Sequence, residues 1–174
     1  MKIETERLLL RELKMDDVDD LHIILSDPES MKHYPQPYSL EKSEGWVKWN
    51  MNNYATYGFG IWAVILKEEN KLIGDCGITM QTINGKKVPE IGYHINKKYT
   101  QKGYATEAAR ACRDYAFNHL GLEKVYSYMK YTNKASSRVA EKNGMTFIME
   151  YEDDVNTITK VYAITREEYT NLKK

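Results

Sequence analysis

The fold is decided by residues 90–117, which read EIGYHINKKYTQKGYATEAARACRDYAF. The stretch begins as a strand, turns through a loop, and opens a helix at residues 103–106. Small apolar residues recur in that helix at helical spacing: Ala105, Ala108, Ala109, Cys112 and Ala116. Because the first peptide N–H groups of a helix have no partner within it and the helix dipole is positive there, this start suits phosphate oxygens. The sequence therefore predicts an anion site near residues 101–106.

Two common phosphate-binding motifs are missing from the chain. It contains neither GxxxxGK[ST] nor GxGxxG, so a P-loop kinase and a Rossmann dinucleotide-binding protein are both excluded. A purely structural interpretation of the same stretch is also open. Gly103 would then only ease a turn, and the alanines would only let the helix pack closely on a sheet. The rest of the chain must decide between these interpretations.

Length and charge indicate one domain without a general affinity for charged polymers. The chain has 174 residues, which is enough for a single domain spanning residues 1–174. Lys plus Arg and Asp plus Glu both number 25, so no overall charge favours nucleic acid or a membrane surface, and we expect neither as a partner. A local basic cluster remains compatible with phosphate binding.

The cysteines and the N-terminal residues indicate a cellular location. Cys76 and Cys112 are far apart and have no metal-binding or redox spacing, so we expect two free thiols, a reducing compartment and no metal. The start MKIETERLLLREL does not resemble a signal peptide, and no apolar run approaches the length of a membrane span. We therefore expect a soluble, cytoplasmic protein.

Hydrophobic periodicity and turn residues predict alternating strands and helices. A strand is expected at 7–13, a helix from Asp17 to the Asp27-Pro28 break, and a second helix capped by Ser39. The second helix shows one stripe, formed by Leu40, Val47, Met51 and Tyr54. The remaining elements are expected at 58–66, 71–81, 88–95 and 124–131 (strands), 133–143 (helix), and 145–151 and 157–164 (strands).

Connections between these elements predict a mixed sheet. Asn84-Gly85 is the strongest short-range signal for a hairpin, and the polar residues 67–70 make another turn. Residues 90–131 form a strand–helix–strand crossover, which should be right-handed and should place its two strands side by side and parallel. The fold class is therefore α/β, with a mixed sheet.

Four segments, in this order and spacing, resemble the GNAT superfamily of N-acetyltransferases, in particular its RimJ/RimL-like (ribosomal-protein-alanine acetyltransferase-like) branch. They are TERLLLREL, EIGYHI, TQKGYATEA and NKASSRVAEKNGM. The resemblance covers nearly the whole chain. It implies a mostly antiparallel twisted sheet of about seven strands with one splayed parallel pair, flanked by about four helices. It also implies acetyl-CoA as co-substrate and no metal.

The resemblance assigns the anion site to the pyrophosphate of acetyl-CoA and the gap between the splayed strands to its pantetheine arm. The cofactor-binding residues that it implies are Tyr93, His94, Ile95, Gln101, Lys102, Gly103, Tyr104, Ala105, Thr106, Asn133, Ser136 and Arg138. The chain departs from the family pattern Q/R-x-x-G-x-G/A at Thr100. It also has Gly144-Met145 where Gly-Phe is usual, and Phe147 is expected to compensate.

Acetyl transfer to an amine needs a base for the amine and an acid for the departing thiolate. Glu90, on the strand beside the cofactor, is the first candidate for the base and His94 the second; Glu90 could equally be a solvated carboxylate at a strand end. Ser136 matches the hydroxyl that serves the family as acid, although a serine there also suits helix capping. Tyr131 or Tyr128 could replace it.

The acceptor site is expected in residues 31–57, a segment rich in aromatic residues: Tyr34, Tyr38, Trp46, Trp49, Tyr54 and Tyr57. These could form a cage for a cation or belong to the core. The acceptor is expected to be a protein N-terminus or a small-molecule amine. For an antibiotic or polyamine, an acidic pocket could come from Asp16, Asp17, Asp19, Asp20, Glu41 and Glu44. A non-catalytic CoA-binding sensor is the alternative function. The protein is expected to be a monomer or homodimer.

Overall fold

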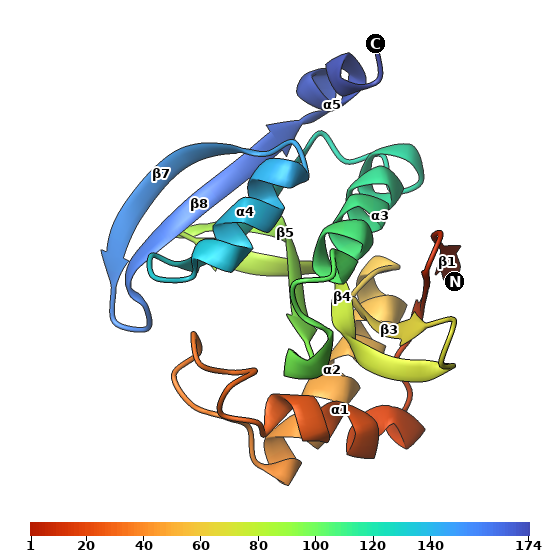
Figure 1. Ribbon diagram of the computed structural model, residues 1–174. Coiled ribbons are helices and arrows are strands. Elements are labelled where there is room, and N and C mark those ends of the chain that lie inside the picture. The colour runs from red at the N-terminus through yellow and green to blue at the C-terminus, as the bar shows by residue number, and fades with distance from the viewer.

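Eight strands form one sheet, with the spatial order β1-β2-β3-β4-β5-β6-β8-β7 (Figure 1). This is a computed structural model, which describes residues 1–174. The strands are β1 (Lys2–Glu4), β2 (Leu8–Glu12), β3 (Ile61–Leu66), β4 (Lys71–Ile83), β5 (Lys86–Ile95), β6 (Lys124–Lys130), β7 (Thr146–Asp153) and β8 (Thr157–Thr165). The helices are α1 (Val18–Leu25), α2 (Leu40–Tyr57), α3 (Tyr104–Asn118), α4 (Lys134–Lys142) and α5 (Arg166–Leu172). Short 3₁₀ turns occupy Met15–Asp17 and Lys97–Tyr99.

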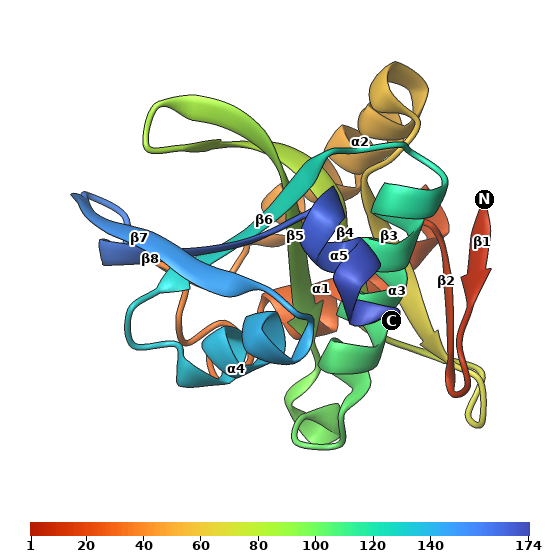
Figure 2. The ribbon, with the colours of Figure 1, turned by 90° about the horizontal axis from the view of Figure 1, so that it is seen from above.

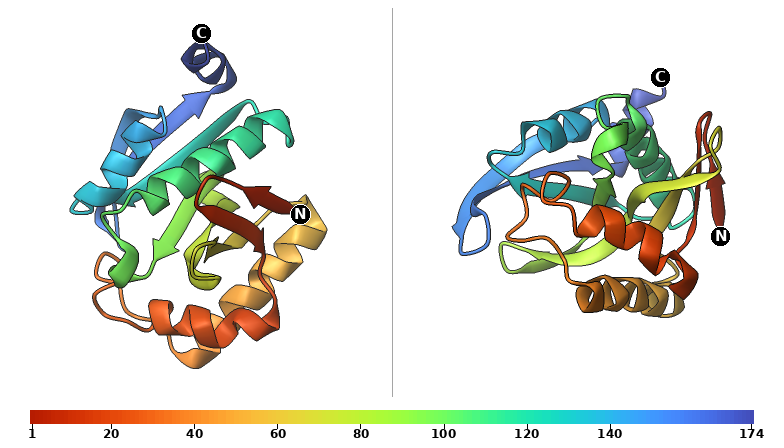
Figure 3. Two further views of the ribbon diagram at one scale, coloured as in Figure 1. Left: turned by 45° about the vertical axis from the view of Figure 1, so that its right-hand side comes forward. Right: turned by 60° about the horizontal axis from the view of Figure 1, so that its bottom comes forward.

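The central strand β3 divides its side chains between two apolar cores, because alternate residues of a strand point to opposite faces. Ile61, Ala63 and Ile65 pack in the core beneath α1 and α2. Trp62 and Val64 pack in the opposite core, which includes Ala108, Ala109 and Ala116 of α3 and Ala140 of α4. Figure 3 shows α1 and α2 (orange) separated by the sheet from α3 and α4 (green and cyan). Strand β3 reads as a continuous apolar run because both of its faces are covered.

The predicted connections are confirmed. Asn84 and Gly85 adopt positive φ values of 49° and 78° in the two-residue turn between β4 and β5, as the hairpin signal requires. Ser39 caps α2 by accepting a hydrogen bond from the N–H of Lys42 at 3.1 Å. The mixed α/β sheet with one parallel pair is present, with one strand and one helix more than expected, β1 and α5.

The stripe predicted for α2 is wrong at Leu40 and Met51 but holds at Val47, which is fully buried, and at Tyr54, which packs against the core. Leu40 and Met51 are 48% and 40% exposed, whereas the buried residues of the helix are Ser43, Val47, Asn50 and Asn53. Asn50 is buried because its side-chain oxygen accepts from the N–H of Ile61 at 2.8 Å, and its amide nitrogen donates to the carbonyl of Trp46 at 3.0 Å. A buried polar side chain with partners of this kind does not show in hydrophobic periodicity.

Strands β5 and β6 form the only parallel pair, and they separate soon after they meet (Figure 2). Their ladder contains one bridge, between Glu90 and Tyr126. One residue further, the hydroxyl of Ser127 donates to the carbonyl of Ile91 at 2.9 Å, so a side chain now spans the space. Beyond Ile91 the edge of β5 is no longer paired with β6. This opening places the functional site between the two strands.

No helix of the structure is both long enough and apolar enough to cross a lipid bilayer.

Candidate functional site

Two neighbouring cavities occupy the opening between β5 and β6. The first has a volume of about 420 Å³ and lies between the end of β5, the start of α3 and α4. We call it the cofactor cavity. Most of the predicted cofactor-binding residues line it: Tyr93, His94, Ile95, Gln101, Gly103, Tyr104, Ala105, Thr106, Asn133 and Arg138. Lys102 does not line it, and Ser136 lines the second cavity instead.

The start of α3 presents its peptide N–H groups to the cofactor cavity. Gly103 is the N-cap residue with φ +84°, and no side chain caps this helix end. The preceding Gln101 also has a positive φ, 62°. Because the first N–H groups of a helix have no partner within it, those of Tyr104, Ala105 and Thr106 are available to an anion at this end. This is the helix start at which the sequence analysis expected an anion site.

Arg7 holds this loop in place from outside, a role that the sequence analysis did not identify. Its Nη1 donates to the carbonyl of Lys102 at 2.9 Å, and its Nε pairs with Glu107 at 2.7 Å. Its guanidinium also lies 4.3 Å from the ring centroid of Tyr104. Burial alone would raise the pKa of Glu107, but hydrogen bonds from Thr5 and Arg7 hold this pKa below its usual value. One side chain thus fixes the loop and the first turn of α3.

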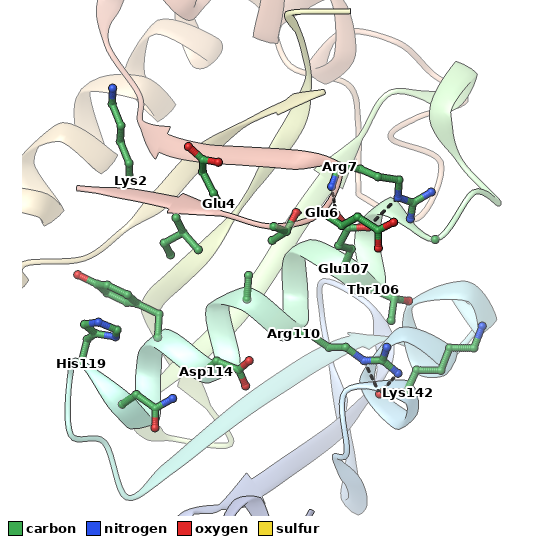
Figure 4. Close-up of a pocket in the computed structure, with 16 residues that line it drawn as sticks. Lys2, Glu4, Glu6, Arg7, Thr106, Glu107, Arg110, Asp114, His119 and Lys142 are labelled. Atoms are coloured by element: carbon green, nitrogen blue, oxygen red, sulfur yellow. Dashed lines mark hydrogen bonds and ion pairs between the residues drawn. The ribbon is translucent and has the colours of Figure 1, made fainter. Parts of the chain in front are cut away.

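A larger cavity lies on the other side of α3 and is a charged surface groove. It measures about 1010 Å³ and is bounded by the N-terminal residues and the outer face of α3 (Figure 4). Several of its charged groups already have partners: Arg7 pairs with Glu107, and Arg110 donates to the carbonyl of Lys142 at 2.9 Å. None of the residues that line it is buried, in contrast to Glu90 in the opening between β5 and β6.

Replacing Arg7 by methionine should weaken CoA binding by roughly 3- to 10-fold, because the carbonyl of Lys102 loses a charged donor while an unbranched side chain remains. Isothermal titration calorimetry with CoA measures the change. The matched control is Arg166→Met. Arg166 also bonds backbone carbonyls, those of Phe117 and Leu122, but it lies outside both cavities. An equal loss of affinity in the two variants would contradict a specific role for Arg7.

The second cavity, of about 320 Å³, continues from the first and contains Glu90. We call it the acceptor cavity. Glu90 is 7% exposed, and burial raises its pKa well above the ordinary carboxyl value, opposed only by a backbone hydrogen bond from Tyr128. Glu90, Gly92 and His94 project from one face of β5. A Cβ at Gly92 would lie 3.0 Å from Oε1 of Glu90. The carboxyl group of Glu90 therefore lies over Gly92, on the side of the strand towards His94.

Aromatic side chains from the segment 31–57 form the other wall of the acceptor cavity. Tyr34, Tyr38 and Trp46 line it, and all three belong to the segment in which the sequence analysis expected the acceptor site. The others lie elsewhere: Trp49 stacks outside Trp46, Tyr54 bonds the backbone of Leu13 and Ile61, and Tyr57 packs on Phe59. The acidic residues considered for a cation pocket line neither cavity: Asp16, Asp17, Asp19, Asp20, Glu41 and Glu44. Glu90 is therefore the acidic residue lining this cavity.

Ser136 lies on the opposite wall, at the start of α4. Its N–H donates to the side-chain oxygen of Asn133 at 3.1 Å, so Asn133 caps the helix. The Ser136 hydroxyl neighbours the phenol of Tyr93; burial raises the pKa of Tyr93 to about 12, and Ser136 opposes part of that rise. Tyr128 lines the same cavity with a pKa that burial raises, whereas Tyr131 lines neither cavity. Ser136 and Tyr128 thus remain the hydroxyl candidates near Glu90.

His94 is hydrogen-bonded to Asp75, a fully buried residue that the sequence analysis did not identify. Its Nδ1 lies 2.8 Å from Oδ1 of Asp75, and its backbone N–H donates to the same oxygen at 2.9 Å. The other oxygen of Asp75 accepts from Nε1 of Trp46 at 2.9 Å. A single aspartate within the apolar strand β4 was the available signal. The other histidines, His22, His33 and His119, do not line the acceptor cavity.

Comparisons with known proteins agree on one family. The model of the Acetyltransferase (GNAT) domain matches residues 7–146. The Bacillus subtilis (strain 168) protein named "Uncharacterized protein YkkB" is 38% identical over 147 residues, covering 84% of this chain and 86% of its own. An acetyltransferase (GNAT family) structure from Bacillus anthracis is 32% identical with a TM-score of 0.81, covering 96% of this chain and 99% of its own. RimL, a ribosomal L7/L12 alpha-N-protein acetyltransferase solved with coenzyme A, shares the fold at 17% identity and a TM-score of 0.79, covering 95% and 98%.

Proposed function

The chain belongs to the GNAT family of acetyltransferases, and from this premise we propose that it transfers the acetyl group of acetyl-CoA to the nitrogen of a primary amine. The single observation that carries the proposal is the meeting of two cavities in the opening between β5 and β6. One has an uncapped helix start, and the other has a buried carboxyl group. A two-substrate transfer needs such an arrangement, because both substrates must meet at the acetyl carbon.

The residues of the cofactor cavity fit acetyl-CoA. Its pyrophosphate would accept hydrogen bonds from the N–H groups of residues 101–106, and Arg138, which lines the cavity, would contribute positive charge. The carbonyls of Ile91 and Tyr93 accept bonds from Ser127 and Tyr34, so these odd-numbered residues of β5 face the opening. The N–H groups of Tyr93 and Ile95 therefore face it as well. When bound, acetyl-CoA supplies an activated thioester.

The backbone of β5 also suggests which groups polarise the acetyl carbonyl. The N–H of His94 is already bonded to Asp75, which leaves the N–H groups of Tyr93 and Ile95 as candidate donors. A fixed donor at the position where negative charge develops lowers the barrier to acyl transfer. We therefore place the acetyl carbonyl beside Tyr93 or Ile95.

We assign the base to Glu90 and the acid to Ser136. Glu90 in the acceptor cavity takes a proton from the incoming ammonium group, since a raised pKa makes its carboxylate a stronger base than an exposed one. Ser136 on the facing wall gives a proton to the departing sulfur. Both residues line the acceptor cavity, which is consistent with action on one reacting centre.

We propose two classes of acceptor, which differ in size. The likeness of fold to RimL supports the RimJ/RimL-like branch and a protein N-terminal amine. The volume of about 320 Å³ and the aromatic wall of Tyr34, Tyr38 and Trp46 support a small-molecule amine. We propose the cytoplasm as the site of action for either acceptor, where acetyl-CoA is available and Cys76 and Cys112 stay reduced.

The test is release of free CoA thiol across a panel of peptide N-termini, polyamines and aminoglycosides, with the acetylated product confirmed by mass spectrometry. Acetylation of one class well above the rate without enzyme is the expected result and identifies the acceptor. CoA binding without turnover on any amine would contradict the proposed transfer and support a non-catalytic CoA-binding protein.

Replacing Ser136 by alanine should lower kcat by roughly 10- to 100-fold and leave CoA affinity nearly unchanged, because its hydroxyl acts only as sulfur departs. Steady-state kinetics and calorimetry measure the two quantities. Ser137→Ala is the control, since the hydroxyl of Ser137 bonds the carbonyl of Asn133 at 3.4 Å and lines neither cavity. An unchanged kcat in Ser136→Ala would transfer the acid role to Tyr128 or to water.

A further inference from the structure

The acceptor cavity and the cofactor cavity share a small set of residues, and these mark where the acetyl carbon and the amine would meet. The residues that line both are Tyr34, Tyr93, His94, Asn133 and Val139. Burial raises the pKa of Tyr93 to about 12, and the phenol of Tyr34 donates to the carbonyl of Tyr93 at 3.4 Å, so neither phenol is a ready proton acceptor near neutral pH. Asn133 and Val139 do not titrate. His94 is the one shared residue whose side chain is suited to accept a proton there.

Asp75 fixes the orientation and the tautomer of this imidazole. Asp75 is fully buried and accepts three hydrogen bonds, from the His94 N–H at 2.9 Å, from His94 Nδ1 at 2.8 Å and from Trp46 Nε1 at 2.9 Å. A carboxylate that accepts from Nδ1 places the ring proton on Nδ1. The lone pair of a neutral imidazole is then on Nε2, and Nε2 is buried without any hydrogen-bond partner.

The surroundings of His94 keep the ring in this position. The ring centroids of Tyr34, Trp46 and Tyr38 lie 5.0, 5.8 and 6.4 Å from that of the imidazole. The titratable groups on the side of His94 are Asp75 on β4, Tyr34 and Tyr38 on the loop before α2, and Glu90 on the same face of β5, whereas the side chain of Tyr93 projects from the opposite face. A buried nitrogen without a partner, on a residue that lines both cavities, indicates a group that bonds a substrate.

We propose that Nε2 of His94 accepts the proton that the acceptor nitrogen loses as it bonds to the acetyl carbon, and that Asp75 and Trp46 are positioning residues. The proposal rests on the proposed transfer and adds a second base to it. Glu90 takes the first proton from the ammonium group. The N–C bond forms and the C–S bond breaks, its electrons remain on sulfur, and Ser136 gives sulfur a proton. His94 takes the second proton from the nitrogen. The nitrogen thus loses two protons and the sulfur gains one, so the reaction as a whole releases one proton.

The variant His94→Asn tests the role of Nε2 separately from the hydrogen bond between residue 94 and Asp75. The asparagine amide can still donate to Asp75, but the atom corresponding to Nε2 is gone. We expect kcat to fall roughly 10- to 100-fold, with calorimetric CoA affinity within about 3-fold of the wild type. His22→Asn is the control, because His22 bonds Ser43 at 2.8 Å and lies outside both cavities. An undiminished kcat in His94→Asn would overturn the proposal while leaving the proposed transfer intact.

The role of Asp75 has a test that needs no turnover. Side-chain ¹⁵N NMR of the free protein should show His94 protonated on Nδ1, and Asp75→Asn should produce a mixture of tautomers or reverse the preference. Trp46→Phe, which removes one donor to Asp75, should lower kcat less than Asp75→Asn without raising the KM for acetyl-CoA. An Nε2-protonated ring in the wild type would overturn the inference. If the wild type acetylates no amine, the proposed transfer fails first and the role of His94 fails with it.

Discussion

Replacing Gly103 by valine should reduce CoA affinity by at least roughly 100-fold, because the loop would lose the backbone shape that exposes the first N–H groups of α3. Gly103 has φ +84°, a region that a β-branched residue adopts only under strain. A Cβ at this position would also lie 3.2 Å from Nη2 of Arg7, the side chain that holds the loop. Strain and displacement act together at one residue, so we expect the largest effect on binding here.

Strain alone also destabilises the protein, so the comparison needs a second glycine. Gly121 has φ +66°, and a Cβ there would meet no atom within 4 Å. It follows α3 at the end remote from the cofactor cavity. Gly121→Val should therefore share the backbone strain and keep CoA affinity within about 3-fold of the wild type. Calorimetry with CoA, together with thermal unfolding of both variants, separates the two effects. Unchanged affinity in Gly103→Val would remove the pyrophosphate site from the start of α3.

Local signals in the sequence were sufficient to predict the turns, helix caps and strand connections that surround the site. The structure confirms the Asn84-Gly85 turn, the cap at Ser39 and the parallel pairing of the two strands joined by the crossover 90–131. The glycine at the start of α3 was identified in the same way, whereas Ser136 was named only through the family resemblance. Such features can be predicted because the residues that cause them lie within a few positions of one another.

Contacts between distant segments could not be predicted in this way. Arg7 bonds the carbonyl of Lys102, and Asp75 bonds His94, over separations that no local pattern reports. The buried polar face of α2 was missed for the same reason. Asn50 is buried because its side-chain oxygen accepts a hydrogen bond from the N–H of Ile61, which lies on β3. Strand β1 has three residues and α5 has seven, and both depend on packing against the rest of the fold. Long-range polar partners thus determine the parts of the site that periodicity does not show.

Replacing Glu90 by glutamine should lower kcat by roughly 10²- to 10⁴-fold, because the acceptor nitrogen loses its first proton acceptor while shape and burial are kept. The pH dependence follows from the raised pKa of Glu90, which burial causes. The wild-type kcat should rise with pH as the buried carboxyl ionises, through a pKa above the ordinary carboxyl value. The variant should lack this rise. A wild-type profile that is flat from pH 5 to 9, or a variant that keeps the rise, would contradict a basic role for Glu90.

The pH dependence of thermal stability provides a control for Glu90→Gln, because the raised pKa of Glu90 also predicts how stability changes with pH. When the pH exceeds the ordinary carboxyl pKa, the unfolded chain releases this proton while the folded protein retains it. The folded state then binds more protons than the unfolded state, so the contribution of Glu90 to stability falls as the pH rises towards its raised pKa. Glutamine removes the dependence. Relative to the wild type, the variant should therefore become more stable as the pH rises from the ordinary carboxyl pKa towards the raised one, while its activity is lost, so its low kcat cannot come from unfolding.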